Sequence, residues 1–426
     1  MSDYDLPVES LDLVLRYLDL IEQDTKALRS SLFVNKQWNF AASRRIWRKI
    51  PAYALGRVER DRRPRYSHYI HEIEFSDAIV PKQEPGEEPG YTDIELHHQF
   101  RKLDFSRLKS FTATHANNNN GERLPFAQYI QENLEKFTLY GTDPDDDILE
   151  LLETRCANTL THLDFCFDPD GLTSQRLQHF FDNCPFLKSL FIRGDLHDIV
   201  DVPLLQRLAT YRGLQSLKMG VYLRAAILEP IIFHGVNQPF KDIRHFQLWI
   251  PSVRLSMFAE NFQRHCPNLI SLHLTINDST FNPVPELRHL TNLQELRLVL
   301  LEGAEWPVVD IRLLGVFMFL RVLVIYSLNG HIRCPSMRDR DFLFGIFNKR
   351  YLKELDFQIH PAVPLTSQVL RVLGRHCWYL MKLRLCGKFD LRALKPEDDD
   401  GLLCTYPILR RLELGGVNYA GGKKRR

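Results

Sequence analysis

The sequence predicts an α/β repeat array that follows a small, all-helical N-terminal module. Three observations lead to this prediction. An apolar motif recurs at a nearly constant spacing over most of the 426 residues, helix-like stretches separate its copies, and the first 50 residues lack it. A repeat of 20–50 residues is the usual signature of an architecture built from stacked structural units.

The motif has the form Leu-x-x-Leu-x-Leu, with other apolar residues allowed, and it occurs thirteen times. From Leu108 onward, successive copies begin 26, 26, 27, 27, 29, 26, 24, 27, 32, 28 and 29 residues apart. The last two apolar positions of each copy are two residues apart, so both side chains would point to one face of a strand. The central residues are Ile73, Phe111, Phe137, Leu163, Leu190, Leu217, Phe246, Leu272, Leu296, Leu323, Leu355, Leu383 and Leu412.

The stretches between these strands predict helices. Thr173, Ser256 and Thr366 are residue types that cap helix N-termini, and apolar residues follow each of them at helical spacing. These followers are Leu177, Phe180 and Phe181; Met257, Phe258 and Phe262; and Val369, Leu370 and Leu373. Several of the helices should run into a turn that contains a cysteine, at Cys184, Cys266 and Cys377.

This pattern resembles a leucine-rich-repeat solenoid of the ribonuclease-inhibitor-like kind. The resemblance implies a right-handed solenoid over residues 67–426, with a parallel sheet on the concave side, helices on the convex side and a short basic tail. One repeat cannot bury its own apolar face, so neighbouring repeats must stack. The Asn or Cys usual at the ninth position of the repeat occurs only as Asn277, and we therefore expect an irregular curvature.

Residues 1–50 predict a separate helical module, which residues 51–66 would link to the solenoid. Leu6 and Pro7 open a first helix, with the proline in the first turn where its missing N–H costs nothing. A second and a third helical stretch carry the remaining apolar residues. The apolar positions are Leu11, Val14, Leu15 and Leu18; Leu28, Leu32 and Val34; and Trp38, Ala41, Ala42, Ile46 and Trp47. About 45 residues lie near the lower size limit for independent folding, so the module should need the solenoid or a partner.

The segments Leu6-Pro-Val-Glu-Ser-Leu-Asp-Leu-Val-Leu-Arg-Tyr-Leu18, Leu32-Phe-Val-Asn-Lys-Gln-Trp38 and Arg45-Ile-Trp47 resemble an F-box, although Ser10 replaces an apolar residue. The resemblance implies docking onto the Skp-type adaptor of a cullin–RING ubiquitin ligase. The residues implied as interface or supporting core are Leu6, Pro7, Leu11, Val14, Leu15, Leu18, Leu32, Val34 and Trp38. Alternatively, the module caps the solenoid and binds no partner. Ile46 and Trp47 are expected in internal packing or at the joint to the solenoid.

In such a solenoid, the residues that flank the central apolar residue of each strand face the concave surface. Aromatic and basic residues are frequent among them, and this composition is typical of binding hot spots. We predict that they bind an unknown protein substrate, with contributions from Phe191, Lys218, His245, Trp249, His273, Arg297, Tyr326 and Arg384. The alternative is that these positions are merely exposed and that the aromatic rings only cover neighbouring strands.

Composition and charge limit the classes of function. Lys and Arg number 55 against 53 Asp and Glu, for a formal net charge of +2. General binders of nucleic acid or membrane surfaces usually show a clear excess of one sign, so we expect neither partner. Eight cysteines without a C-x-x-C pair, together with an acidic start, predict the cytosol or the nucleus. The basic residues 57–65 and 423–426 are either a nuclear signal or solvated segments.

Motifs for enzyme chemistry are missing from the sequence. No metalloprotease, nucleotide-binding or hydrolase signature occurs. Residues 143–147 begin like a calcium loop, but Ile148 and Thr154 stand where Gly and Glu are required. An acidic helix N-terminus is favoured there. The His-Cys pairs at 265–266 and 376–377 recur at one repeat position, which favours buried turns over zinc ligands.

The sequence thus predicts a non-catalytic protein without metal or cofactor, the substrate-recognition subunit of a Skp–cullin–F-box ubiquitin ligase. The first alternative is a repeat scaffold or inhibitor that never enters a ligase. The second is an enzyme with a site in a loop insertion. Binding to the adaptor separates the prediction from the first alternative.

Overall fold

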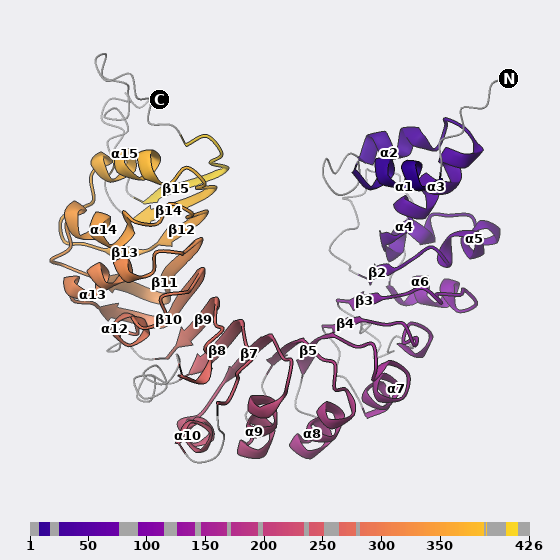
Figure 1. Cartoon of the computed structure of the whole chain (residues 1–426), viewed down its shortest axis with the longest axis horizontal. Coiled ribbons are helices and arrows are strands. Elements are labelled where there is room, and N and C mark those ends of the chain that lie inside the picture. The colour runs from indigo at the N-terminus through magenta and orange to yellow at the C-terminus, as the bar shows by residue number, and fades with distance from the viewer. Residues whose placement is uncertain are drawn as a thin grey trace, which may run out of the picture. The chain divides into compact units, whose positions relative to one another are not determined.

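The computed structural model describes residues 8–17, 25–75, 93–114, 126–140, 146–167, 172–194, 199–233, 238–250, 264–277, 282–386, 389 and 406–415. The chain divides into two compact units, Met1–Leu196 and His197–Arg426. In each unit, strands alternate with helices, and the helices lie along one side of a parallel sheet (Figure 1).

The first unit begins with three helices, α1 (Val8–Tyr17), α2 (Thr25–Ser31) and α3 (Lys36–Ile46). Its strands pair in chain order and in parallel: β1 (Lys49–Pro51), β2 (Glu72–Phe75), β3 (Ser110–Ala113), β4 (Lys136–Leu139), β5 (His162–Phe167) and β6 (Ser189–Gly194). The helices between them are α4 (Ala52–Gly56), α5 (Arg63–Ser67), α6 (Asp93–Phe100), α7 (Asp146–Cys156) and α8 (Ser174–Asn183).

The second unit continues the alternation. Its sheet follows the order β7 (Ser216–Tyr222), β8 (His245–Ile250), β9 (Ser271–Ile276), β10 (Glu295–Glu305), β11 (Val322–Arg333), β12 (Glu354–Phe357), β14 (Lys382–Cys386) and β15 (Arg411–Gly415). The short β13 (Ile359–His360) extends the sheet beside the end of β11. The helices are α9 (Val202–Thr210), α10 (Ala225–Phe233), α12 (Val284–Leu287), α13 (Val308–Leu313), α14 (Asp339–Ile346) and α15 (Ser367–His376).

The predicted repeat is confirmed strand by strand. All thirteen central residues lie on strands, and within each unit they are direct partners across the parallel pairs, as Leu272, Leu296 and Leu323 are. All are buried against the helices except Leu412, which lies on the last described strand. The two-residue period of a strand explains this burial, because the apolar residues of each strand point to the helices and their neighbours point away.

The predicted helix signals also hold where the structure describes them. The Thr173 hydroxyl accepts the N–H of Arg176 at 3.1 Å, and the Thr366 hydroxyl accepts the N–H of Gln368 at 3.3 Å. The apolar residues predicted to follow both caps are buried, as are Cys184, Cys266 and Cys377 in their turns. The helix predicted after Ser256 lies outside the described residues.

The sheet begins earlier than the sequence predicts. Strand β1 pairs with β2 through Lys49 and Glu72, and α4 and α5 follow directly, so residues 51–66 belong to the first repeat instead of forming a linker. Ile50 is the partner of Ile73, which places Trp47 and Ala52 at the outer motif positions. Tryptophan and alanine at these two positions depart from the Leu-x-x-Leu-x-Leu form, so the motif is not evident in the sequence here. The Trp47 ring stacks on Tyr66 at 4.6 Å between centroids, so Trp47 lies at the expected joint.

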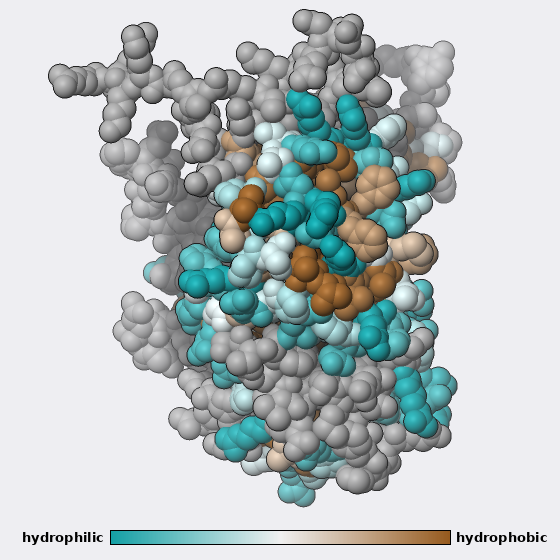
Figure 2. All heavy atoms as spheres, turned by 90° about the vertical axis from the view of Figure 1, so that its left-hand side faces the viewer, coloured by the Kyte–Doolittle hydropathy of each residue, from teal (hydrophilic) through white to brown (hydrophobic). Residues whose placement is uncertain are grey.

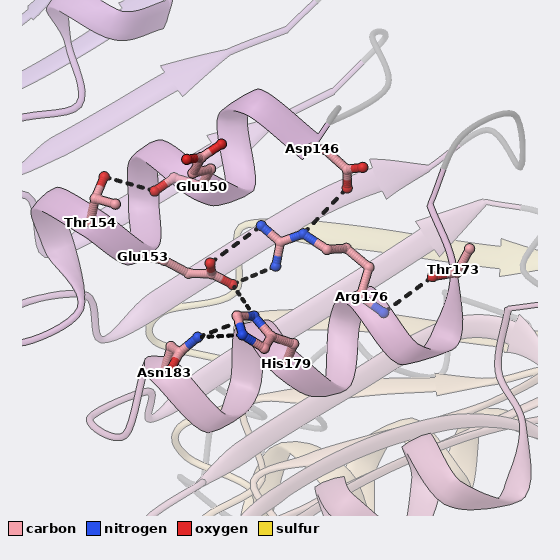
Figure 3. A network of polar contacts seen from close by, with 8 residues as sticks. All are labelled: Asp146, Glu150, Glu153, Thr154, Thr173, Arg176, His179 and Asn183. Carbon is pink, nitrogen blue, oxygen red and sulfur yellow. Dashed lines mark hydrogen bonds and ion pairs between the residues drawn. The ribbon is translucent and has the colours of Figure 1, made fainter.

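Polar side chains connect neighbouring repeats on the helical side. The Arg176 guanidinium on α8 contacts Glu153 on α7, and its Nε lies 3.3 Å from the Asp146 carboxylate (Figure 3). The His179 Nδ1 lies 3.5 Å from the same Glu153 carboxylate. Asp146 and Asp147 form the acidic first turn of α7, as the sequence predicts.

Candidate protein-binding surfaces

Helices α1, α2 and α3 share an apolar core. It consists of Leu11, Leu15, Leu28 and Ala42, with Leu32, Trp38, Ala41 and Ile46 packed against it. The Asn35 side chain caps α3 by accepting the N–H of Trp38 at 2.9 Å. The Arg45 Nη2 donates to both oxygens of Asp12, at 2.9 and 3.0 Å, and so ties α3 to α1.

Large apolar side chains remain exposed outside this core. We call them the module's exposed set: Leu13 (64% exposed), Val14 (42%), Phe33 (87%), Val34 (59%) and Phe40 (51%). Of these, Phe40 contacts Tyr69 edge-on at 6.1 Å between ring centroids. Packing within the three helices therefore uses one set of apolar residues and leaves a second set in contact with water.

The predicted adaptor-binding residues divide between the two sets. Leu11 and Leu15 are core residues, so they can only support a binding surface from within, and Leu32 and Trp38 are half-buried. Val14 and Val34 are exposed. Leu6, Pro7 and Leu18 lie outside the described residues. The assignment of these residues to adaptor binding stays a prediction.

The sequence reasoning missed Leu13, Phe33 and Phe40 because it selected residues at helical spacing. That spacing identifies the buried stripe of a helix, whereas these residues lie beside the stripe or in the turn after α2. One signal in the sequence could have identified them: each is a large apolar residue that the buried stripe of the helix does not need.

The exposed sheet face of the second unit collects seven of the eight predicted substrate-binding residues. Strand register places the side chains in rows across neighbouring strands. The middle row reads Lys218, Gln247, His273, Arg297, Val324, Asp356, Arg384 and Glu413. His245 lies in the row before it, and Trp249 and Tyr326 lie in the row after it.

Carboxylates offset much of the positive charge that the sequence predicts for this face. The Arg297 Nη2 lies 3.1 Å from Glu354, and the Arg384 Nε lies 3.0 Å from Glu413. Burial lowers the pKa of His273 to about 4, helped by Arg297 and Lys218, so this imidazole is neutral at physiological pH. Burial also lowers the pKa of His245. The face therefore presents paired charges and neutral rings to a ligand.

Phe191, the eighth predicted residue, lies in the first unit. The Arg193 guanidinium carbon lies over its ring at 4.0 Å from the centroid and over the Tyr140 ring at 4.6 Å. The Tyr140 hydroxyl donates to Asp164, and burial together with this hydrogen bond raises the tyrosine's pKa. Tyr140 was not among the predicted residues, although it follows a strand at the spacing of the repeat.

The helical side of the second unit carries an apolar groove that the sequence analysis did not identify. It has a volume of about 580 Å³ and is lined by Val309, Leu313, Val316, Leu343, Phe344 and Phe347, with Arg312 and Arg340 beside them. Figure 2 shows apolar side chains gathered among charged ones on this side of the molecule. Phe344 points outward from α14, whose buried face Phe342 supplies.

These features define an α/β repeat solenoid with exposed surfaces at its helical start, on its sheet and on its helices. No family model matches the sequence, and no curated protein matches it. A solved structure of the yeast Rad7–Elc1 complex is similar over 96% of this chain and 92% of that chain, at 14% identity and a TM-score of 0.44.

No helix in the described segments is long and apolar enough to cross a membrane. No group of three or more His, Cys, Asp or Glu residues there is placed to hold a metal ion.

Proposed function

We propose that this protein is a non-catalytic substrate-recognition subunit of a Skp–cullin–F-box ubiquitin ligase. Helices α1–α3 would dock onto the Skp-type adaptor, and the sheet face of the repeats would hold a target protein. The F-box resemblance of residues 6–47 supports the first part. The rows of paired charges and aromatic rings on the second unit's sheet support the second part. Such a complex works in the cytosol or the nucleus.

The observation that carries the proposal is the module's exposed set. These side chains are not needed for the core of α1–α3, which Leu11, Leu15 and Leu28 already fill. Exposed apolar residues in number usually mark a protein–protein contact, and a helical face that enters a partner's groove is a common mode of recognition. An adaptor groove would remove them from water.

The mechanism would be positioning. A target held on the repeats of an adaptor-bound chain is confined near the charged ubiquitin carrier, so transfer to a target lysine gains effective concentration. The receptor then needs no nucleophile, base or metal of its own. Target choice would depend on how a target replaces the ion pairs around Arg297, Arg384 and Glu354, because separating them without compensation costs free energy.

Co-purification of the full chain with a Skp-type adaptor tests the proposal. The double substitution Val14→Asp and Val34→Asp should abolish complex formation, because it puts charges on exposed positions of the module. Phe344→Asp is the matched control, since Phe344 is also exposed but lies on α14 of the second unit. The control should bind like the unchanged protein.

Two outcomes would count against the proposal in different ways. If the unchanged chain does not bind the adaptor, the protein is a scaffold or inhibitor outside the ligase. If the double variant binds as well as the control, the docking surface is assigned to the wrong residues. Circular dichroism of both variants shows whether the fold is retained.

A further inference from the structure

At one position of the repeat, polar side chains form hydrogen bonds between neighbouring turns. This position is the residue directly before the first Leu of the motif, in the turn that leads into each strand. The Asn133 Nδ2 donates to the Ser106 carbonyl at 3.2 Å, and the Asn268 Nδ2 donates to the Lys241 carbonyl at 3.1 Å. The Thr159 hydroxyl donates to the Glu132 carbonyl at 2.9 Å. In these three repeats, a polar side chain at this position connects the turn to the turn of the preceding repeat.

The last four described repeats carry apolar residues at this position. They are Phe319, Tyr351, Tyr379 and Ile408, and their exposed fractions are 50%, 54%, 52% and 42%. Each lies three residues before a strand residue, and those four strand residues, Val322, Glu354, Lys382 and Arg411, are direct partners. We call these four side chains the apolar row. Because neighbouring strands lie about 4.8 Å apart, the row is roughly 14 Å long.

Two side chains at the middle of the apolar row lie next to each other. The rings of Tyr351 and Tyr379 are nearly parallel, at 24°, with centroids 6.4 Å apart. Met318 and Trp378, one residue earlier in two of the turns, are also half-exposed or more. The indole N–H of Trp378 donates to the Arg375 carbonyl at 2.5 Å, so its one polar atom is satisfied and its ring surface is left for contact.

The same turns are rich in cations. Arg321, Lys353 and Arg410 directly follow the first Leu of their repeats, and Arg350 and Arg375 lie in the same turns; all five are exposed. Residues 317–321, 347–353, 375–381 and 406–410 include no Asp or Glu. None of the five cations forms an ion pair with another residue that the structure describes. This contrasts with the sheet face, where arginines and carboxylates pair.

We propose that this edge of the second unit binds an extended, acidic segment of a partner protein in which apolar side chains alternate with carboxylates. An extended chain rises about 3.3 Å per residue, so the row matches four or five residues of such a segment. The apolar side chains would cover the row, and the carboxylates would face the unpaired cations. A single-stranded nucleic acid could stack bases on the aromatic rings of the row, but Ile408 and Met318 add aliphatic surface that suits apolar side chains better, and the test below includes an oligonucleotide. The proposal does not depend on ligase membership.

A peptide-display selection on the full chain tests this inference. The counter-selection uses the triple variant Phe319→Asn, Tyr351→Asn and Tyr379→Asn, which should fold because asparagine already occupies this position at Asn133, Asn268 and Asn292. We expect enriched peptides in which Asp or Glu alternates with apolar residues. Fluorescence anisotropy of one labelled selected peptide should show binding at least tenfold weaker to the triple variant.

Two further variants make the test specific. Phe186 occupies the same position and is 53% exposed. The repeats on either side carry Thr159 and Gly213 at this position, so Phe186 is not part of an apolar row. Phe186→Asn should therefore leave peptide binding unchanged. The double variant Lys353→Glu and Arg410→Glu should weaken binding and remove most of its salt dependence.

Three results would overturn the inference. The selection could fail to enrich peptides that distinguish the unchanged chain from the triple variant. The enriched peptides could lack an excess of acidic residues. A labelled single-stranded oligonucleotide could bind more tightly than the selected peptide and be lost in the triple variant. Adaptor co-purification of the triple variant is expected to be normal, so failure here and failure of the proposed function are distinguishable.

Discussion

At the residue scale, Lys349 is a charged group that lies buried in a turn between two repeats. Its side chain is fully buried, and its Nζ donates to the Leu314 carbonyl at 2.7 Å. Loss of water lowers the pKa of this lysine from 10.5 to about 7. The unfolded chain therefore holds this proton more tightly than the folded chain between these two values. A charge that the fold must desolvate is a local cost to stability.

We predict that the free energy of unfolding rises with pH between 7 and 10.5, because the unfolded state binds more protons in that window. Lys349→Met should raise the free energy of unfolding near pH 7 by roughly 2–4 kcal/mol, since one pKa unit corresponds to about 1.4 kcal/mol and a hydrogen bond is lost. The variant should also show less of the rise with pH.

Urea unfolding at pH 7 and pH 9.5 measures both effects. Lys353→Met is the control, because Lys353 is an exposed lysine four residues away. A Lys349→Met protein less stable than the unchanged chain at pH 7 would mean that the hydrogen bond outweighs the desolvation.

At the scale of elements, the contacts between neighbouring helices determine how repeats hold together. Arg176 on α8 is 20% exposed at its side chain and Glu153 on α7 is 10% exposed, whereas Asp146 is 66% exposed. Removing one partner of a largely buried ion pair leaves the other charge without compensation. An exposed pair gains little because water screens it. Of the two acidic partners of Arg176, Glu153 should therefore contribute more to the free energy of unfolding than Asp146.

We predict that Glu153→Gln destabilises the α7–α8 pair by roughly 1–3 kcal/mol, and that Asp146→Asn costs less than about 0.5 kcal/mol. Hydrogen exchange at the backbone amides of α7 and α8 reports the free energy of local opening for both variants. Equal effects of the two substitutions would show that burial does not decide the strength of this network.

At the scale of the whole molecule, the proposed docking and target-binding surfaces lie on different elements. The adaptor would contact α1 and the turn after α2, and the target would contact strands such as β8 and β11. Each repeat packs mainly on its neighbours in a solenoid, so local changes should stay local. Substitutions on one surface should then leave the other function intact.

We predict that Trp249→Ala combined with Tyr326→Ala leaves adaptor co-purification unchanged but strongly reduces the set of proteins captured only with the adaptor-bound chain. Mass spectrometry that compares adaptor-bound and adaptor-free captures measures this set. Loss of adaptor binding in the same variant, with the fold retained, would contradict the separation of the two surfaces.

Single residues show why the fold could be predicted and much of the candidate site could not. Leu296 and Leu323 are identified by a local period, and the same period places them on paired strands. The pairing of Arg297 with Glu354 joins residues that are 57 positions apart. Strand β11 lies between the strands of these two residues, and Val324, the residue of β11 that is the direct partner of Arg297, carries no charge. No local pattern contains that information.

The sequence by itself determined the repeat, its strands, the Thr173 and Thr366 caps and the helical character of the N-terminal residues, because periodicity and capping act within one or two turns of chain. Only the tertiary structure decided that Leu11 and Leu15 are core while Leu13 and Phe33 stay in water. It also decided that the sheet arginines are paired and that Phe319, Tyr351, Tyr379 and Ile408 form one row. Burial, charge pairing and alignment across strands are properties of residues brought together by stacking, and stacking joins positions that are far apart in the chain.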